Sequence, residues 1–175
     1  MSVILTGFMG TGKTTIGRQL ARRLGKGFVD TDQRIEQLEG RSVAEIFAAA
    51  GEAYFRELER RVVAEAVKMD AVVATGGGAI VDAANFERMH AAGPIICLTA
   101  DVEVILQRTA YNKNRPLLDA KERRQRVEEL LRVRSAAYAR ADVAIDTSKR
   151  SIANVLDDIV AFLQRESNRR EEDRR

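Results

Sequence analysis

Short apolar runs alternate along the chain with longer stretches in which apolar residues recur every three or four positions. Several of the short runs are apolar throughout, which is typical of parallel strands covered on both faces. The longer stretches have the period of amphipathic helices. The pattern predicts strands at residues 3–6, 27–30, 71–75, 95–98 and 143–146.

The predicted helices lie between these strands. Apolar residues recur at every fourth position from Ile16 to Leu24, directly after the first strand. Ser42 and Glu45 have the spacing of a capping box, and Asp82 can cap the helix that follows it. This β-α-β-α alternation predicts an α/β fold, a parallel sheet with helices on both faces. Further helices are predicted at residues 52–69, 102–108, 121–138 and 152–164.

The 175 residues fit a single domain, and no linker or internal repeat divides them. We expect this domain to cover residues 1–165 and the charged tail, residues 166–175, to fray because it has nothing to bury. No apolar run approaches the ~20 residues that a membrane-spanning helix needs. The first residues also lack the charged region of a signal peptide. These features predict a cytoplasmic protein without a membrane partner.

The net charge of +3 is too balanced to indicate nucleic-acid binding. Residues 108–150 carry twelve Lys or Arg and six Asp or Glu, a surplus of six positive charges. This region is either a solvated basic face or a site for an anionic ligand. RNA binding is disfavoured, because the segment has few aromatic residues and no recognised motif. One cysteine, Cys97, and one histidine, His90, offer neither a metal cluster nor a hydrolytic triad.

The segment from Gly7 to Thr14 matches the phosphate-binding P-loop at every required position and lies between a predicted strand and a predicted helix. Its glycines let several backbone N–H groups converge on phosphate oxygens, and the helix N-terminus adds a positive dipole end. Lys13 can reach the β- and γ-phosphates, and the hydroxyl of Thr14 can bind Mg²⁺. The loop predicts nucleoside triphosphate binding through Gly10, Thr11, Gly12, Lys13, Thr14 and Thr15.

Asp30 and Asp32 follow the second predicted strand, whose carboxyl end faces the same crevice as the P-loop. One carboxylate suits Mg²⁺, while the other could accept a hydroxyl proton or orient that hydroxyl toward the γ-phosphate. The structural alternative for Asp32 is capping of a helix N-terminus.

Two further features favour transfer of the phosphoryl group to an acceptor. The glycine run at residues 76–78 follows the third predicted strand and offers bare backbone to a ligand. Arg56, Arg115 and Arg134 supply positive charge, although each could instead be a solvated surface residue. Arg115 lies in a stretch without periodicity between two predicted helices, as expected of a lid arginine that stabilises transition-state charge.

In combination these motifs resemble the shikimate kinase family. The resemblance runs from about residue 3 to residue 163, and it implies a five-stranded parallel sheet with the P-loop fold of nucleoside monophosphate kinases. It also implies a kinase domain with a substrate-binding region at about 31–60 and a lid at about 109–120. The implied reaction is ATP-dependent phosphorylation of the shikimate 3-hydroxyl, with Mg²⁺ as cofactor, in chorismate biosynthesis. The matched segments are Gly7-Phe8-Met9-Gly10-x-Gly12-Lys13, Asp30-Thr31-Asp32, Phe55-Arg56-x-x-Glu59, Gly76-Gly77-Gly78 and Arg115-Pro116-Leu117-Leu118.

The resemblance implies a role for each matched residue. Thr14 and Asp30 would serve Mg²⁺, Arg108 is the candidate to stack on adenine, and Arg115 would also contact ATP. Glu59, one helical turn beyond Arg56, could hold that guanidinium in place. The catalytic residues would be Lys13, Asp32 as the candidate base, and Arg115. Shikimate would contact Asp32, Arg56, Gly77, Gly78 and Arg134, with the two arginines on its carboxylate.

The chain departs from the family pattern in two places. The family usually carries Pro-Leu-Tyr after the carboxylate arginine, whereas here Arg134 and Tyr138 keep their spacing without the proline. The family often has a proline near the start of the last helix, and no proline follows Pro116. The alternatives are another small-molecule kinase of this fold, for gluconate or a nucleotide, and a nucleotide-binding regulatory module without catalysis. We expect a monomer that binds ATP and shikimate.

Overall fold

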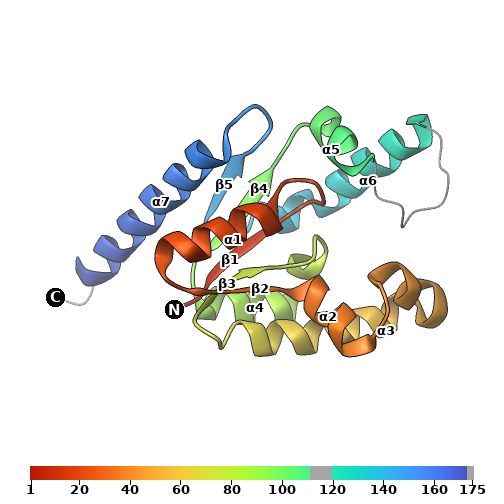
Figure 1. Ribbon diagram of the computed structural model, residues 1–175, viewed down its shortest axis with the longest axis horizontal. Coiled ribbons are helices and arrows are strands. Elements are labelled where there is room, and N and C mark those ends of the chain that lie inside the picture. Colours follow the sequence, from red (N-terminus) through yellow and green to blue (C-terminus); the bar gives the residue numbers. More distant parts are fainter. Residues whose placement is uncertain (111–119, 173–175) are drawn as a thin grey trace.

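The computed structural model describes residues 1–110 and 120–172. Within them, five strands form one sheet in the order β2-β3-β1-β4-β5, and every neighbouring pair is parallel (Figure 1). The predicted α/β class and the five-stranded parallel sheet are therefore confirmed. The strands are β1 Val3–Gly7, β2 Gly27–Asp30, β3 Ala71–Ala74, β4 Ile95–Thr99 and β5 Val143–Asp146.

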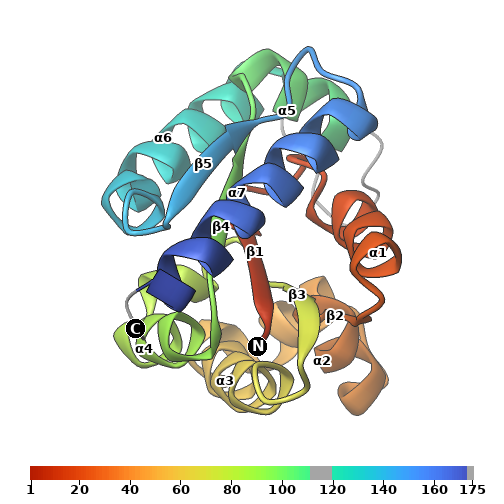
Figure 2. The ribbon, with the colours of Figure 1, turned by 90° about the vertical axis from the view of Figure 1, so that its left-hand side faces the viewer.

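Helices cover both faces of the sheet, as predicted. Helices α1 (Lys13–Leu24) and α7 (Ile152–Glu172) pack on one face, and α3 (Val43–Ala66) and α4 (Ala83–Ala92) pack on the other (Figures 1 and 2). The remaining helical elements are α2 Thr31–Glu39, the 3₁₀ helix η1 Ala79–Val81, α5 Val102–Thr109 and α6 Ala120–Tyr138.

The central strand β1 is buried on both faces because its side chains alternate between two cores. Val3 and Leu5 belong to the core that includes α1 and α7, whereas Ile4 belongs to the core that includes α3 and α4. All three side chains are at most 3% exposed. This two-sided burial explains why the sequence of β1 is continuously apolar rather than alternating.

The predicted helix caps are present. The side chain of Ser42 accepts a hydrogen bond from the backbone N–H of Glu45, whose carboxylate in turn accepts from the N–H of Ser42. The side chain of Asp82 accepts from the N–H of Asn85 at the start of α4. Both caps satisfy N–H groups that a helix start would otherwise leave unpaired.

Several element boundaries differ from the predictions. Helix α2 was not predicted. Helix α3 is interrupted at Gly51 (φ 81°, ψ 173°), so the helix predicted from residue 52 is its second part, which ends at Ala66 rather than at residue 69. The first part begins at Val43, directly after the cap at Ser42. The expectation that residues 166–175 fray was wrong for residues 166–172, which belong to α7. Residues 165–172 continue the helix because most are good helix formers and Arg169 pairs with Glu166 one turn away.

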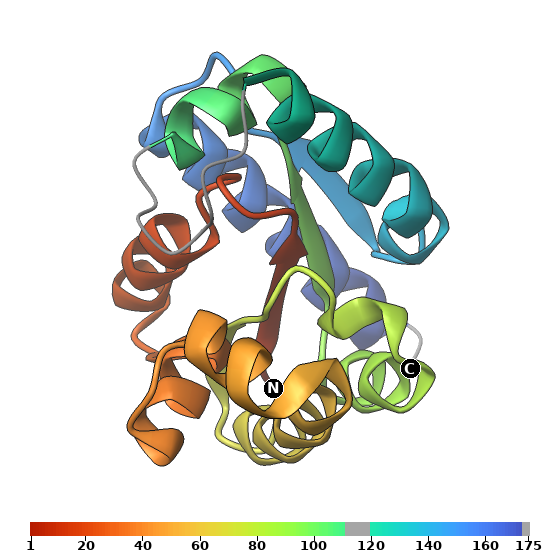
Figure 3. The same cartoon turned by 90° about the vertical axis from the view of Figure 1, so that its right-hand side faces the viewer.

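Two small cores outside the sheet position the segments that surround the site. Ile35 of α2 packs with Ile46 and Phe55 of α3, and Phe8 of the P-loop packs with Ile105 of α5 and with α6. Figure 3 shows the side of the molecule on which α2 and the first half of α3 face α6 across the ends of the strands. Among the described residues, no helix has the length and apolar character that a bilayer crossing requires.

Candidate active site

The P-loop connects β1 to α1 with backbone geometry that requires glycine. Gly12 has φ 96° and Gly10 has φ 78°, both in the left-handed region that side chains disfavour. At Gly7, an added Cβ would lie 2.1 Å from the carbonyl oxygen of Leu98 in the neighbouring strand. The Thr11 hydroxyl donates to the carbonyl of Phe8 (2.7 Å), which closes the loop on itself. The loop is thus preformed.

Lys13 lies inside the curve of this loop. Its ammonium donates to the carbonyl oxygens of Gly7 (2.8 Å) and Phe8 (2.9 Å). Burial lowers the pKa of Lys13 to about 8, against the opposing effect of the nearby Asp32 and Asp30 carboxylates. A phosphate group placed in the loop would give this ammonium a stronger anionic partner than the carbonyls.

Asp30 connects the P-loop helix to α2. Its Oδ2 accepts from the hydroxyl of Thr14 (2.7 Å), and its Oδ1 accepts from the backbone N–H groups of Asp32 (3.1 Å) and Gln33 (3.2 Å). The N-cap of α2 is therefore Asp30, and the capping alternative considered for Asp32 was wrong. The contact with Thr14 brings together the two oxygen donors that were predicted to serve Mg²⁺.

Capping by Asp30 leaves the carboxylate of Asp32 free for another partner. Its Oδ1 is buried and has no hydrogen-bond partner in the described part of the chain. Burial raises the pKa of Asp32 to about 6, with further contributions from Asp30 and Glu59 and opposition from Lys13. An unpaired buried carboxylate oxygen is costly, so it points to a hydrogen-bond donor supplied by a ligand.

Gly76 forms the opposite wall of this space. A Cβ at Gly76 would lie 2.7 Å from Oδ1 of Asp32 and 2.9 Å from Oε1 of Glu59. Oε1 of Glu59 is also buried without a partner in the described residues. Two acceptor oxygens therefore border one small space beside the glycine run, which suits a ligand with more than one hydroxyl group.

Arg56 projects from α3 toward the same glycine run. Its guanidinium pairs with the buried carboxylate of Glu59 (2.8 Å) and with the more exposed Glu52 (3.2 Å). A Cβ at Gly78 would lie 2.7 Å from one guanidinium nitrogen of Arg56 and 2.8 Å from the other. The predicted contact between Glu59 and Arg56 is confirmed, and Gly78 gives the guanidinium room.

Arg134 reaches the glycine run from the other side, on α6. Its Nη1 lies 3.2 Å from the position of a Cβ at Gly77, and its guanidinium lies 5.7 Å from the centre of the Phe8 ring. The hydroxyl of Tyr138, one turn along α6, donates to the carbonyl of Gly77 (2.7 Å). Arg56 and Arg134 thus meet at adjacent glycines, although 78 residues separate them in the sequence.

Arg108 lies on the far side of the P-loop, at the end of α5. Its guanidinium donates to the carbonyl of Gly10 (3.1 Å) and to the hydroxyl (3.0 Å) and carbonyl (2.8 Å) of Thr147. Thr147 also donates to the carbonyl of Thr11 (2.9 Å). Thr147 was not among the predicted site residues, since a lone threonine after a strand matches no motif.

A cavity of about 230 Å³ lies beside Arg108 and the first turn of α1. Thr15 lines it, and Ile152, the first residue of α7, stands in the region where a proline is frequent in the family that the sequence resembles. The cavity adjoins the P-loop, and Ile16, Ile152 and Val155 give it an apolar wall against which a flat base could pack. Arg115 and the predicted lid interior, residues 111–119, lie outside the described residues.

Comparisons with known proteins identify the family of the chain. The family model described as shikimate kinase matches residues 9–164. The chain belongs to the shikimate kinase family. A shikimate kinase from Caldanaerobacter subterraneus subsp. tengcongensis is 43% identical over 160 residues, which are 91% of this chain and 94% of that protein.

Solved structures show the same fold. A shikimate kinase from Acinetobacter baumannii in complex with shikimate superposes with a TM-score of 0.88 at 38% identity, covering 94% of this chain and 93% of that one. A gluconokinase from Sinorhizobium meliloti superposes with a TM-score of 0.63 at 15% identity, over 98% of this chain and 96% of that one. At that identity the gluconokinase shares only the fold, so the comparisons favour the shikimate kinase family.

Proposed function

We propose that the chain transfers the γ-phosphoryl group of ATP to the 3-hydroxyl of shikimate, giving shikimate 3-phosphate and ADP. The observation that carries this proposal is the convergence of three groups on residues 76–78: the unpaired carboxylate oxygen of Asp32 and the guanidinium groups of Arg56 and Arg134. Shikimate carries a carboxylate and several hydroxyl groups on one ring. Two guanidinium groups suit its carboxylate, and the unpaired oxygen suits a hydroxyl.

In this proposal Lys13 and the P-loop N–H groups hold the phosphates of ATP, as in other P-loop proteins. The acceptor hydroxyl lies between Asp32 and the γ-phosphate. Its oxygen forms the new bond to phosphorus, the bond from phosphorus to the bridging oxygen breaks, and the electron pair leaves with ADP. The hydroxyl proton passes to Asp32, whose raised pKa makes it a competent acceptor near neutral pH.

Mg²⁺ is the metal that we expect with ATP. Thr14 and Asp30, whose side-chain oxygens lie 2.7 Å apart beside the loop, would hold the ion, since Mg²⁺ is commonly held by one or two protein oxygens together with phosphates and water. The ion would neutralise phosphate charge.

The remaining site assignments are part of the same proposal. Gly77 and Gly78 would contact the shikimate ring, the 230 Å³ cavity beside Arg108 would hold adenine, and Arg115 would act from the lid. A regulatory module without catalysis is disfavoured, because the relatives are shikimate kinases and none of the residues proposed for catalysis is replaced. The cytoplasmic location and the monomeric state stay predictions.

A coupled assay of ADP formation tests the proposal. Shikimate should accelerate ATP turnover, whereas gluconate and nucleoside monophosphates should leave it at the background rate of hydrolysis. Lys13→Ala should abolish the acceleration. Acceleration by gluconate or by a nucleoside monophosphate, without an effect of shikimate, would contradict the acceptor assignment.

A further inference from the structure

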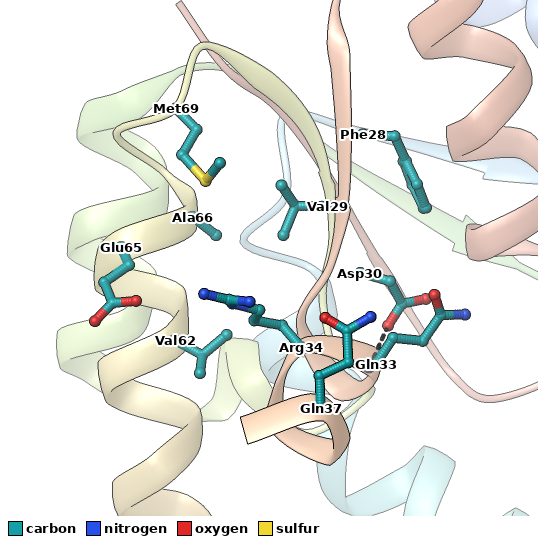
Figure 4. A pocket seen from close by; sticks show the side chains of 10 residues that line it. All are labelled: Phe28, Val29, Asp30, Gln33, Arg34, Gln37, Val62, Glu65, Ala66 and Met69. Carbon is teal, nitrogen blue, oxygen red and sulfur yellow. Dashed lines mark hydrogen bonds between the residues drawn. The ribbon is translucent and has the colours of Figure 1, made fainter. Parts of the chain in front are cut away.

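A second cavity, of about 350 Å³, lies at the edge of the sheet between β2, α2 and α3 (Figure 4). Its wall includes Asp30, but none of Lys13, Asp32, Arg56 or Arg134 lines it. The cavity is thus separate from the space in which shikimate is proposed to bind. Its volume falls at the lower end of the range for small-molecule sites.

The cavity carries opposite charges that lack partners. Arg34 extends from α2 across the cavity toward α3, which carries Glu65 on the far side (Figure 4). The side chains of Arg34 and Glu65 make no hydrogen bond or ion pair with other described residues, and both residues are exposed. The oxygens of Asp30, in contrast, are already engaged by the Thr14 hydroxyl and by the backbone at the start of α2.

Of the other seven lining residues, five are apolar and two, Gln33 and Gln37, carry amides. Val29, Val62 and Ala66 line it from the sheet and from α3, and Met69, which is 62% exposed, lies at its edge. A methionine side chain is flexible and adapts to the shape of a ligand. A ligand for this cavity therefore needs an apolar body as well as groups that pair with a guanidinium and a carboxylate.

We propose that this cavity binds a small α-amino acid with an apolar side chain. The ligand carboxylate pairs with Arg34, its ammonium group pairs with Glu65, and its side chain contacts Val29 and Val62. Two carboxylates and one guanidinium give the lining a formal charge of −1, which disfavours phosphate and other polyanions and favours a neutral zwitterion.

Asp30 relates this cavity to the kinase site. It borders the cavity, caps α2 and accepts from Thr14, while Asp32 lies in the first turn of α2. A ligand held between α2 and α3 fixes the position of α2 and thereby the position of the Asp32 carboxylate. This second step rests on the proposed function and predicts that the amino acid changes the KM for shikimate.

Isothermal titration of the full chain with L-leucine and L-phenylalanine tests binding without reference to activity. We expect Kd on the order of 1 mM. Leucinamide, which lacks the carboxylate, and N-acetyl-L-leucine, which lacks the ammonium group, should each bind about three- to tenfold more weakly. Arg34→Gln and Glu65→Gln should weaken L-leucine binding by a similar factor, whereas Arg61→Gln, an exposed position on α3 outside the cavity, should not.

Three results would overturn the site: no titratable binding of either amino acid, equal binding of L-leucine and its two derivatives, or undiminished binding to both cavity variants. Tighter binding of inorganic phosphate than of L-leucine would also overturn it. Far-UV circular dichroism of each variant checks that the fold is retained. Because the titration is independent of turnover, it can show that the cavity binds an amino acid even where shikimate fails as the acceptor.

Discussion

The guanidinium of Arg56 lies 2.8 Å from the carboxylate of Glu59, one turn along α3, and Glu59 is only 1% exposed. Burial raises the pKa of Glu59, and the contact with Arg56 opposes that rise. The pair holds the guanidinium over Gly78, where it is proposed to meet the shikimate carboxylate. The position of the Arg56 guanidinium thus depends on its ion pair with the buried carboxylate of Glu59.

Glu59→Gln should weaken shikimate binding. The amide keeps the shape but loses the charge that holds Arg56, and charge-assisted hydrogen bonds contribute about 1.5–3 kcal/mol. We expect the KM for shikimate to rise about tenfold or more, with little change in the KM for ATP. Steady-state kinetics in both substrates measure this, and an equal rise in the two KM values would contradict the positioning role.

Arg134→Ala should raise the KM for shikimate about 10- to 100-fold, since it removes one of the two proposed carboxylate partners. The KM for ATP should change far less. Arg132→Ala is the matched control, because Arg132 is an exposed arginine on the same helix. If both variants raise the KM for shikimate equally, the rise comes from a change in α6 as a whole, and the proposed contact of Arg134 with the carboxylate is wrong.

The fold was largely predictable from the sequence because parallel strands that are buried on both faces have continuously apolar sequences. Val3, Ile4 and Leu5 all had to be apolar, since they alternate between two cores. The P-loop was equally visible, because only glycine fits the backbone at positions such as Gly12.

The parts that sequence did not reveal depend on long-range contacts. Helix α2 has a weak apolar pattern, and the deciding fact, that Asp30 rather than Asp32 caps it, rests on the Thr14 hydroxyl holding the other oxygen of Asp30. The approach of Glu59 to Gly76 and the contact of Thr147 with Arg108 bring together segments far apart in the chain. No local spacing indicates such contacts.

The activity should depend on pH through Asp32 and Lys13. If Asp32 accepts the proton, it must be ionised, so log kcat/KM for shikimate at saturating ATP should rise with pH up to about 6. By contrast, kcat/KM for ATP, which reports the enzyme with an empty loop, should fall above about pH 8, where Lys13 loses its charge. A profile that is flat from pH 5 to pH 7 would argue that Asp32 only orients the hydroxyl.

The raised pKa of Asp32 also makes stability depend on pH, but stability falls with rising pH where activity rises. The folded-state pKa of Asp32, about 6, lies above the ordinary value of 3.8, so the protonated form is favoured on folding. The contribution of Asp32 to the free energy of unfolding is fully present below pH 3.8 and is lost as pH rises through about 6. Asp32→Asn should therefore raise the midpoint of thermal unfolding at pH 7 more than at pH 4, while it abolishes most activity.

Gly76→Ala should inactivate the site while the fold persists. The new methyl group would lie 2.7 Å from Oδ1 of Asp32 and 2.9 Å from Oε1 of Glu59, in the space assigned to the shikimate hydroxyls. We expect kcat/KM for shikimate to fall at least about 100-fold. Gly27→Ala is the control, since its Cβ would meet only the Cβ of Ala71 at 3.7 Å, and it should keep nearly full activity.

The most direct test of the account compares shikimate with its methyl ester as acceptors for the wild type and for Arg134→Ala. If Arg56 and Arg134 hold the carboxylate beside Asp32, the wild type should prefer the acid over the ester by about 100-fold in kcat/KM, and the variant should lose most of this preference. The account would be contradicted if the wild type used acid and ester equally well, or if the variant kept the full preference.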